Sequence, residues 1–527
     1  MRASRIVCGT LAWALVLMPA ASYGTVIELG QLAGQHGNAI HQWRFEGTTA
    51  TVQRQDSVGT AALSRVPGSG ATEPTFAAGF DASTQAVQFY GDAAFRSSAF
   101  SHPNTGTVEY LYCPSVPGTG HIVSATGASG NRLYYGTGYS GTDGAAFGTG
   151  NPYANAYEAF LTGSTTPDLA ANHWYYVAVT QKRSGAQIFV DAYVADLTEG
   201  QTLLSHTIQN VVKGAANANY GSAPLGLGVQ GNQDNNYYTG RLDEVTYYNA
   251  RLAQPLLQHH LDTLYGTAAN TYAATVFSDG PTGYWRFEDP SSASGATAAN
   301  SATRMDGTYG SGLSHAAGVM AIGGQSTNFA GSDGIAVPRE DLRAALTGAS
   351  AITCEAWILN DALPTSGVEY IFGTRLNGGT AGAELMLDAT GIRMAGRSST
   401  SDSYQMKTAP FTPDGKWHHV VGILDFPNDT IRIYIDSIEA LVESASFASS
   451  VYQPGTSFTQ IDGIGASPAG GSFWDGLLDE VALYAYRLGD DEIQKHYLAG
   501  TAAIPEPTVL ALLGLGLAAL ARRRRRR

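Results

Sequence analysis

Hydrophobic positions along the chain form short runs that alternate with polar residues. The runs at 175–180 and 420–424 are rich in β-branched and aromatic residues, and those at 187–190 and 431–435 alternate around bulky side chains. Clusters of glycine, asparagine, aspartate and proline separate the runs. Short apolar or alternating runs bounded by turn-forming residues are typical of β-strands. The pattern therefore predicts an all-β chain built of many short strands.

Helical periodicity is clearest in two segments, and each of them follows a long series of strands. Residues 252–265 and 490–498 have apolar side chains at helical spacing, and Gly266 and Gly500 follow them as stop signals. Residues 267–274 are small and polar. This composition predicts a linker between two units that each end in a helix.

The chain repeats itself with a period of about 240 residues. The clearest pairs of segments are 42–46 with 284–288, 173–177 with 416–420, and 240–245 with 476–481. So long a period indicates tandem globular units, because solenoid repeats are only about 20–50 residues long. Strands followed by one helix in each copy predict two β-sandwiches in tandem. We expect Trp417, in one of the repeated segments, to lie in the core of the second copy.

The second copy resembles the LamG-like domains of the concanavalin A-like lectin/glucanase superfamily. The resemblance rests on 272–288, which end in Tyr-Trp-Arg-Phe-Glu, on Trp-His-His-Val at 417–420, and on 475–484 with Leu-Leu-Asp-Glu-Val. The first copy has Trp-Tyr-Tyr-Val at 174–177 and a degenerate start. It is therefore similar to the same family as a more diverged member.

The resemblance implies a fold and a class of function. It implies two concanavalin A-like jelly-roll sandwiches, one over residues 25–266 and one over residues 275–500, joined by 267–274. Members of the family bind glycans or proteins, often at cell surfaces and sometimes with calcium.

The first 24 residues have the order of a secretory signal peptide. Arg2 and Arg5 precede the apolar stretch 6–18, and small residues in 19–24 offer a cleavage site. An uncleaved membrane anchor is the alternative, but thirteen apolar residues are short for a membrane span. We therefore expect the protein to be exported.

Residues 501–527 have three parts that follow one another in a fixed order. They contain the motif Pro505, Glu506 and Pro507, the apolar stretch 508–521, and the terminal arginines Arg522, Arg523, Arg524, Arg525, Arg526 and Arg527. A helix over 508–521 would be about 21 Å long, which spans a roughly 30 Å hydrocarbon core only if the bilayer thins and the arginine stems snorkel. The arginines would then stay cytoplasmic. An amphipathic tail or a basic nucleic-acid arm is the alternative, although 508–521 has no polar face.

This end resembles the PEP-CTERM sorting signal of Gram-negative bacteria. The resemblance implies recognition by an exosortase, a membrane transpeptidase, with processing near residues 505–507. It also implies that a short transmembrane helix holds the chain in the inner membrane before processing. The protein would then reach the cell surface or the extracellular exopolysaccharide matrix.

Charge and cysteine content narrow the choice of partners. The formal net charge is −14, and without the six terminal arginines, Arg2 and Arg5 it is near −22. So acidic a body repels phosphate backbones, which argues against nucleic acid as a partner. Beyond Cys8 in the signal peptide, the chain has only Cys113 and Cys354. Two buried free thiols are expected, with a bridge between the copies as the alternative.

The sequence predicts no catalytic residues. Glycosidases of this superfamily need two carboxylates in one cleft, usually on a Glu-x-Asp-x-x-Glu strand, which this chain lacks. The acidic pairs 243–244 and 479–480 are the best alternatives. Adjacent residues of a strand point to opposite faces, so neither pair is expected to act on one substrate. Their recurrence favours a structural role, such as an aspartate that accepts loop N–H bonds.

Other motifs also predict structure and not chemistry. Gly-x-Gly-x-x-Gly occurs at 136–141 and 226–231 without a helical pattern after it, which predicts turns. The histidine pairs 259–260 and 418–419 have no cysteine or carboxylate at metal-ligand spacing. They are expected in the core or on a strand surface.

Two groups of residues in the first copy predict binding. Asn131, Tyr134, Tyr135 and Tyr139 combine aromatic rings with an amide, as sugar sites do, with ordinary strand packing as the alternative. The loop residues Asn232, Asp234, Asn235 and Asn236 offer oxygens for calcium, with a simple turn as the alternative.

Together these features predict an exported, surface-sorted protein that binds polysaccharide or surface glycan without catalysis. The alternatives are a structural spacer without a tight ligand and a diverged glycoside hydrolase. The Tyr-rich and Asn-rich segments favour the first copy as the binding one.

Overall fold

The structure is a computed structural model, and it describes most of the chain between residues 26 and 501. The described ranges are 26–67, 72–80, 84–116, 120–126, 132–138, 145–151, 156–158, 170–184, 187–214, 222–231, 234, 236–265, 271–319, 322–374, 381–454, 462–468 and 470–501. We call the part up to residue 265 the N-terminal half and the part from residue 271 the C-terminal half.

The N-terminal half contains two large antiparallel sheets and one small one. The first sheet has the order β14-β13-β12-β7-β17-β4-β3, with β1 paired to β17, and the second has the order β11-β10-β9-β8-β16-β5-β2. The strands of the first sheet are β1 (Ala39–Trp43), β3 (Thr75–Ala78), β4 (Gln85–Tyr90), β7 (Thr105–Pro114), β12 (Tyr175–Ser184), β13 (Gln187–Asp196), β14 (Ser205–Gly214) and β17 (Thr239–Tyr248). Those of the second are β2 (Leu63–Pro67), β5 (Ala93–Ser97), β8 (His121–Thr126), β9 (Arg132–Gly138), β10 (Ala145–Asn151), β11 (Ala156–Glu158) and β16 (Leu225–Leu227). The small sheet pairs β6 (Phe100–Ser101) with β15 (Ser222–Ala223).

The C-terminal half has the same plan of two antiparallel sheets. The orders are β21-β22-β33-β24-β29-β30-β31, with β18 paired to β33, and β19-β20-β23-β32-β25-β26-β27-β28. The strands of the first sheet are β18 (Gly283–Trp285), β21 (Ser314–Ala317), β22 (Gln325–Ala330), β24 (Ala351–Leu359), β29 (His418–Asp425), β30 (Thr430–Ile435), β31 (Ile438–Ser444) and β33 (Asp475–Tyr484). Those of the second are β19 (Thr297–Ala298), β20 (Gly307–Tyr309), β23 (Ile335–Val337), β25 (Val368–Gly373), β26 (Gly382–Asp388), β27 (Gly391–Arg397), β28 (Gln405–Pro410) and β32 (Asp462–Ile464).

The equivalent elements of the two halves follow the predicted repeat. The expected strands appear as β12, β13, β29 and β30, and the same strand order recurs in both pairs of sheets. A left-handed backbone conformation also recurs at the same place in both halves, because φ is 59° at Phe45 and 58° at Phe287. The chain is mostly β-structure in sandwich-like sheets, which is consistent with a jelly roll.

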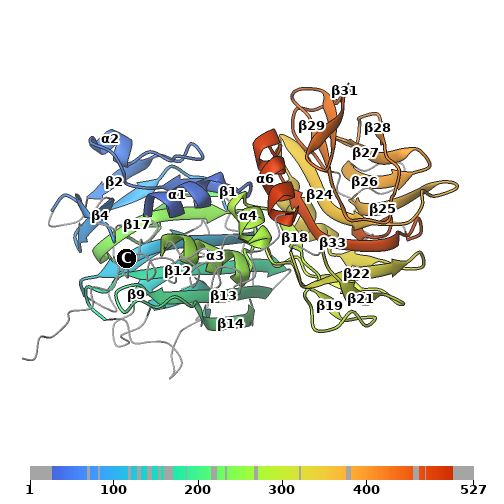
Figure 1. The fold of residues 1–527 in the computed structure, drawn as a ribbon. Coiled ribbons are helices and arrows are strands. Elements are labelled where there is room, and N and C mark those ends of the chain that lie inside the picture. Colours follow the sequence, from blue (N-terminus) through green and yellow to red (C-terminus); the bar gives the residue numbers. More distant parts are fainter. Residues whose placement is uncertain are drawn as a thin grey trace, which may run out of the picture.

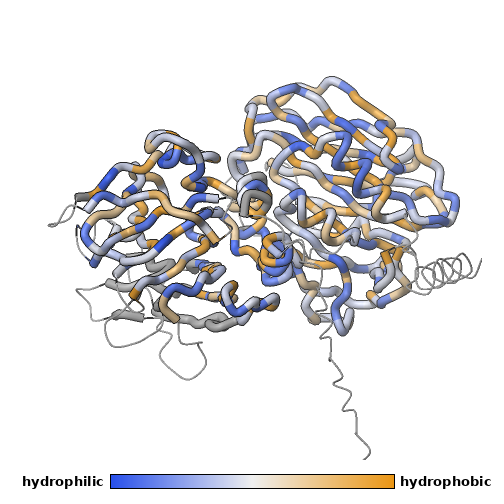
Figure 2. The backbone as a smooth tube through the Cα atoms, turned by 60° about the vertical axis from the view of Figure 1, so that its left-hand side comes forward, coloured by the Kyte–Doolittle hydropathy of each residue, from blue (hydrophilic) through white to orange (hydrophobic). Residues whose placement is uncertain are grey.

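Helices cover the outer face of the first sheet in each half (Figure 1). They are α1 (Val26–Gln35), α3 (Gln254–Leu264), α4 (Tyr272–Ser278) and α6 (Asp490–Thr501). Two further helices are α2 (Ala50–Gln53) and α5 (Arg339–Leu346), and α5 packs Leu342, Ala345 and Leu346 into the core of the C-terminal half. One cluster of buried apolar residues joins α1, α3, α4 and α6 to both of these sheets. This shared cluster ties the two halves together, and Figure 2 shows apolar stretches on the helices where the halves meet.

Polar contacts add to the apolar junction between the halves. The Asn38 Nδ2 atom donates to the carbonyl oxygen of Ala345 at 3.0 Å, and Lys182 Nζ lies 2.6 Å from Asp341 Oδ2. An isolated β-bridge pairs Leu252 with Thr303.

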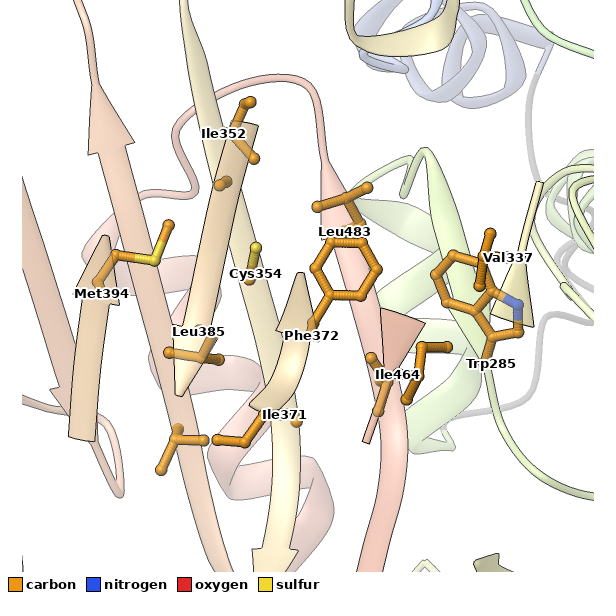
Figure 3. Packing of buried hydrophobic residues seen from close by; sticks show 14 of the residues in the cluster. Trp285, Val337, Ile352, Cys354, Ile371, Phe372, Leu385, Met394, Ile464 and Leu483 are labelled. Carbon is orange, nitrogen blue, oxygen red and sulfur yellow. The ribbon is translucent and has the colours of Figure 1, made fainter. Parts of the chain in front are cut away.

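The core of the C-terminal half lies between its two sheets (Figure 3). Side chains from both sheets point toward one another there, among them Trp285, Cys354, Phe372 and Leu483. Cys113 and Cys354 are both free and buried, as predicted.

Three expectations about local structure are wrong. The predicted linker 267–274 runs into α4, because Thr271 caps that helix by accepting the Ala274 N–H and the helix buries Tyr272 against the sheet. The helix α6 continues through Gly500, which lies against the indole of Trp357. Trp417 is half-buried at the edge of the helix-side cluster and not in the core. The fully buried tryptophans of the described residues are Trp43, Trp285, Trp357 and Trp474.

Candidate functional site

The second sheet of the C-terminal half has an outer face that lies away from the helices. Figure 1 shows β25, β26, β27 and β28 on the side of this half opposite to α4 and α6. We call this sheet the open sheet. Strand alternation sends Leu385 and Leu387 of β26 into the core and places Glu384, Met386 and Asp388 on the outer face.

Glu384 joins two tyrosines on that face. The Tyr370 hydroxyl, on β25, donates to Glu384 Oε1 at 3.1 Å, and the hydroxyl of Tyr404, just before β28, donates to Glu384 Oε2. The carboxylate is 2% exposed, whereas both tyrosines are half-buried. The buried acid therefore holds two partly exposed aromatic rings in place, which lowers the entropy that a ligand must remove on binding.

A second polar group lies further along the open sheet. Arg393 Nη2 lies 2.6 Å from Asp388 Oδ2, and the Thr408 hydroxyl donates to the same oxygen at 2.9 Å. Burial raises the pKa of Asp388, but hydrogen bonds from Thr390 and Thr408 and the charge of Arg393 outweigh it, so the pKa lies below its ordinary value. The face thus combines aromatic rings, a guanidinium and hydroxyls, the mixture that recognises sugars and other polar ligands.

The two carboxylates of β26 are poorly placed for glycoside hydrolysis. Glu384 and Asp388 are four residues apart on one strand, which separates them by about 13 Å. Retaining and inverting enzymes need roughly 5–10 Å between their acids.

The residues that the sequence analysis selected for sugar binding lie in the equivalent sheet of the N-terminal half. Tyr134 and Tyr135 are in β9, which lies between β8 and β10 as β26 lies between β25 and β27. Asn131 and Tyr139 fall outside the described residues. That this group binds a ligand stays a prediction.

The structure describes two of the four residues of the predicted calcium loop. Asp234 is exposed and pairs with Arg96 at 2.9 Å, while the Asn236 side chain donates to Gln230 at 3.2 Å. Asn232 and Asn235 lie outside the described residues. Calcium binding by this loop stays a prediction.

The acidic pairs are buried at a β-bulge. Glu244 and Glu480 have φ of 47° and 49°, and the pairing register of β17 shifts at this point. The bulge overrides strand alternation, so the expectation of opposite faces is wrong: carboxylate oxygens of Asp243 and Glu244 lie within 4.8 Å of each other and of Glu46. At most 3% of any of the four paired residues is exposed, which keeps substrate away.

Burial also changes the acidity of these carboxyls. It raises the pKa of Glu244 to about 8 and that of Glu480 to about 7, against the opposing charge of Arg44 or Arg286. The Oδ2 atom of Asp479 accepts the N–H of Val319 at 3.0 Å. This contact is of the structural kind that the sequence analysis expected.

One histidine of each pair belongs to a buried network centred on an acid that the sequence analysis did not select. His260 lies 2.9 Å from Glu109, and His419 lies 3.3 Å from Glu355. The neighbouring His418 is half-buried and lies 2.8 Å from Asp436. Glu355 also contacts His496 of α6 and accepts the Tyr272 hydroxyl of α4. Glu109 and Glu355 occupy equivalent places in the repeat, and this recurrence is the signal that could have identified them.

The sorting motif and the predicted apolar span lie outside the described residues. Among the helices of the described part, none is long and apolar enough to cross a membrane.

Two segments of the chain match known protein families. Residues 329–494 match the family model of the concanavalin A-like lectin/glucanases superfamily, and residues 503–526 match the PEP-CTERM protein-sorting motif. The sorting motif indicates export and sorting to the cell envelope and implies processing by an exosortase. No curated protein sequence matches the chain.

Several solved structures are distantly similar. One is domain 4 of an extracellular arabinanase from Geobacillus stearothermophilus in complex with arabinotriose, with 15% identity over 40% of this chain and 93% of that one, at a TM-score of 0.30. Another is the CBM40 of the Ruminococcus gnavus IT-sialidase bound to α2,3-sialyllactose, with 13% identity over 32% of this chain and 94% of that one, at a TM-score of 0.26.

Proposed function

We propose that this protein is exported, sorted at the cell envelope by an exosortase-type transpeptidase, and binds a carbohydrate of the cell surface or matrix without catalysis. The ligand lies on the open sheet of the C-terminal half. The observation that carries this proposal is the Tyr370–Glu384–Tyr404 group, in which one buried carboxylate holds two tyrosines.

The family match supports the choice of the C-terminal half. Residues 329–494, which match the lectin/glucanase family model, include all three residues of this group. The sequence analysis favoured the first copy because of its tyrosines at 134, 135 and 139. The proposal moves to the C-terminal half because the tyrosines there are joined by a shared acid.

The arrangement of the acids that the structure describes on β26 and at the bulges supports a binding role over hydrolysis. On the open sheet, Glu384 and Asp388 lie too far apart for either glycosidase geometry. The acidic pairs at the bulges are buried below reach of any substrate. Release of sugar from generic polysaccharides by the purified protein would restore the alternative of a diverged hydrolase.

A glycan array with the secreted protein tests binding against the spacer alternative. We expect retention on one class of neutral or acidic polysaccharide. Replacement of Tyr404 by alanine should reduce the free energy of glycan binding by about 1–3 kcal/mol, a range taken from the stacking of nucleic-acid bases on aromatic side chains. Tyr90, a 46% exposed tyrosine of the N-terminal half, provides the control, and Tyr90→Ala should bind normally. Retention on no glycan would favour the spacer.

The sorting signal makes a separate prediction. Replacing Arg522 to Arg527 with serine should weaken retention of the chain in the inner membrane during export, because the charges that stop transfer are lost. We expect the variant to keep its unprocessed C-terminus and to leave the envelope. Fractionation and the mass of the C-terminal peptide measure both effects. An unchanged location and an unchanged mass would contradict the sorting account.

A further inference from the structure

A small cavity, partly open to solvent, lies at the junction between the two halves. Its enclosed part has room for about one water-sized group. Both halves contribute charged side chains to its wall: Lys182 and Arg251 come from the N-terminal half, and Arg304 and Asp341 come from the C-terminal half. Any ligand in this cavity would therefore contact both halves at once.

The wall of the cavity has three cations and one carboxylate. Lys182 Nζ lies 2.6 Å from the carboxylate of Asp341, so these two charges are paired. The two guanidiniums share the fully buried Asp191, which accepts a hydrogen bond from Arg251 and lies 3.1 Å from Arg304 Nη1. Asp191 is not part of the wall itself. The space inside the cavity is therefore lined mainly by positive charge.

One hydrogen-bond donor of the wall has no partner. Arg251 is 8% exposed, and its Nε atom is buried without an acceptor. Burial lowers the pKa of Arg251, the charge of Asp191 offsets only part of this effect, and the like charge of Arg304 lowers the pKa further. A buried N–H of a charged group without an acceptor is costly, so a bound ion or water is expected beside it.

The backbone holds the two guanidiniums in place. The Arg304 N–H donates to the carbonyl oxygen of Arg251 at 2.8 Å, next to the β-bridge between Leu252 and Thr303. The half-buried Asp306 adds a further opposing charge near both arginines. Because the folded chain already fixes these groups, a ligand would not have to order them on binding.

We propose that Lys182, Arg251 and Arg304 bind a monovalent anion of halide size in this cavity. A guanidinium is weakly hydrated and makes strong hydrogen bonds to anions, so Arg251 Nε gains an acceptor at little cost in solvation. Room for about one water-sized group admits a halide ion and excludes bulky organic anions. Because its ligands come from both halves, the anion stabilises the junction.

The test is a titration of the full chain with sodium chloride, in which sodium gluconate holds the ionic strength constant. We expect a saturable rise in the melting temperature, because an anion that binds only the folded chain stabilises it by mass action. Lys182→Met and Arg304→Gln should each weaken chloride binding by at least tenfold. Lys407→Met is the matched control: its side chain is 29% exposed, against 27% for Lys182, and it also pairs with a carboxylate. It should leave the chloride affinity unchanged.

Crystals of the unaltered chain soaked in sodium bromide locate the anion by its anomalous scattering. We expect a bromide ion in contact with Arg251 Nε. The proposal is overturned if chloride and gluconate have the same effect on melting, or if chloride affinity is unchanged in both Lys182→Met and Arg304→Gln. An equal loss of affinity in Lys407→Met would show a general effect of charge. A cavity without bromide would show that water satisfies Arg251 instead.

Discussion

Replacing His496 with alanine is expected to lower the free energy of unfolding by about 3–5 kcal/mol, the usual cost of removing one partner from a buried ion pair. The imidazole is fully buried between two acids: Nδ1 lies 2.9 Å from Glu355 and Nε2 lies 2.8 Å from Asp279. Burial lowers the pKa of His496, but the charge of Glu355 and the hydrogen bond with Asp279 outweigh it and raise the pKa to about 10. In the variant, the buried carboxylate of Glu355 loses the positive charge and the hydrogen bond that His496 provides.

The same histidine predicts a pH dependence. Its pKa rises from the ordinary histidine value of 6.5 to about 10 on folding, so the folded chain holds more protons between these pH values. Its contribution to stability is therefore complete below pH 6.5 and is lost as the pH rises through about 10. This group alone should lower stability by at most about 1.4 kcal/mol per pH unit in that window.

Urea unfolding of the two chains at pH 7 and pH 9 measures both effects. Lys495→Ala changes the exposed face of the same helix, where the side chain is 63% exposed, and should cost little. If the free energy of unfolding of His496→Ala lies within about 1 kcal/mol of that of the parent, the buried contacts of His496 with Glu355 and Asp279 are not formed. An equal pH slope in parent and variant would assign the titration to another group.

Trp285→Ala is the second large change, with an expected cost of about 3–5 kcal/mol from the lost indole and the cavity that it leaves. Trp285 is fully buried between the two sheets of the C-terminal half, and its ring centre lies 6.1 Å from that of Phe372 (Figure 3). Neighbouring side chains from both sheets limit how far the core can collapse into the space.

Trp417→Ala is the matched control for that substitution. It removes the same side chain from a half-buried position, so its expected cost is about 1–2 kcal/mol. Thermal or urea unfolding of both variants gives the comparison. Equal costs at the two positions would contradict the assignment of Trp285 to the core.

The sequence predicted the sheets well because strand patterning and the repeat act over the whole chain. A run such as 420–424 forms a strand because it buries apolar side chains against the core. The β-bulge recurs at Glu244 and Glu480, which are the middle residues of the two Asp-Glu-Val segments. The helix α4 was missed because the small residues Ala273 and Ala274 give it little helical periodicity, and its stability comes from packing Tyr272 and Phe277 on the sheet.

The candidate site could be predicted less well than the fold. Tyr370 and Tyr404 are 14 and 20 residues from Glu384, and only the order of β25, β26, β27 and β28 in the sheet brings them together. Spacing along the chain gives no sign of that contact. The acidic pairs were misjudged for a related reason, because one left-handed residue at the bulge overrides alternation.

The junction between the halves affects how any ligand is presented. A shared apolar cluster and the Lys182–Asp341 pair join the halves. The open sheet would therefore be held at a fixed orientation to the N-terminal half. This arrangement suits a surface protein that displays a binding face, and it also suits a spacer, so binding itself must be measured.

Calorimetry with the polysaccharide selected on the glycan array, comparing variants of the two halves, tests the central claim most directly. Tyr370→Ala and Tyr404→Ala alter the open sheet of the C-terminal half, whereas Tyr134→Ala and Tyr135→Ala alter β9 of the N-terminal half. We predict that the first two variants lose affinity and that the other two bind as the parent does. Loss of affinity only in the variants of β9 would contradict the account and place the ligand on the N-terminal half.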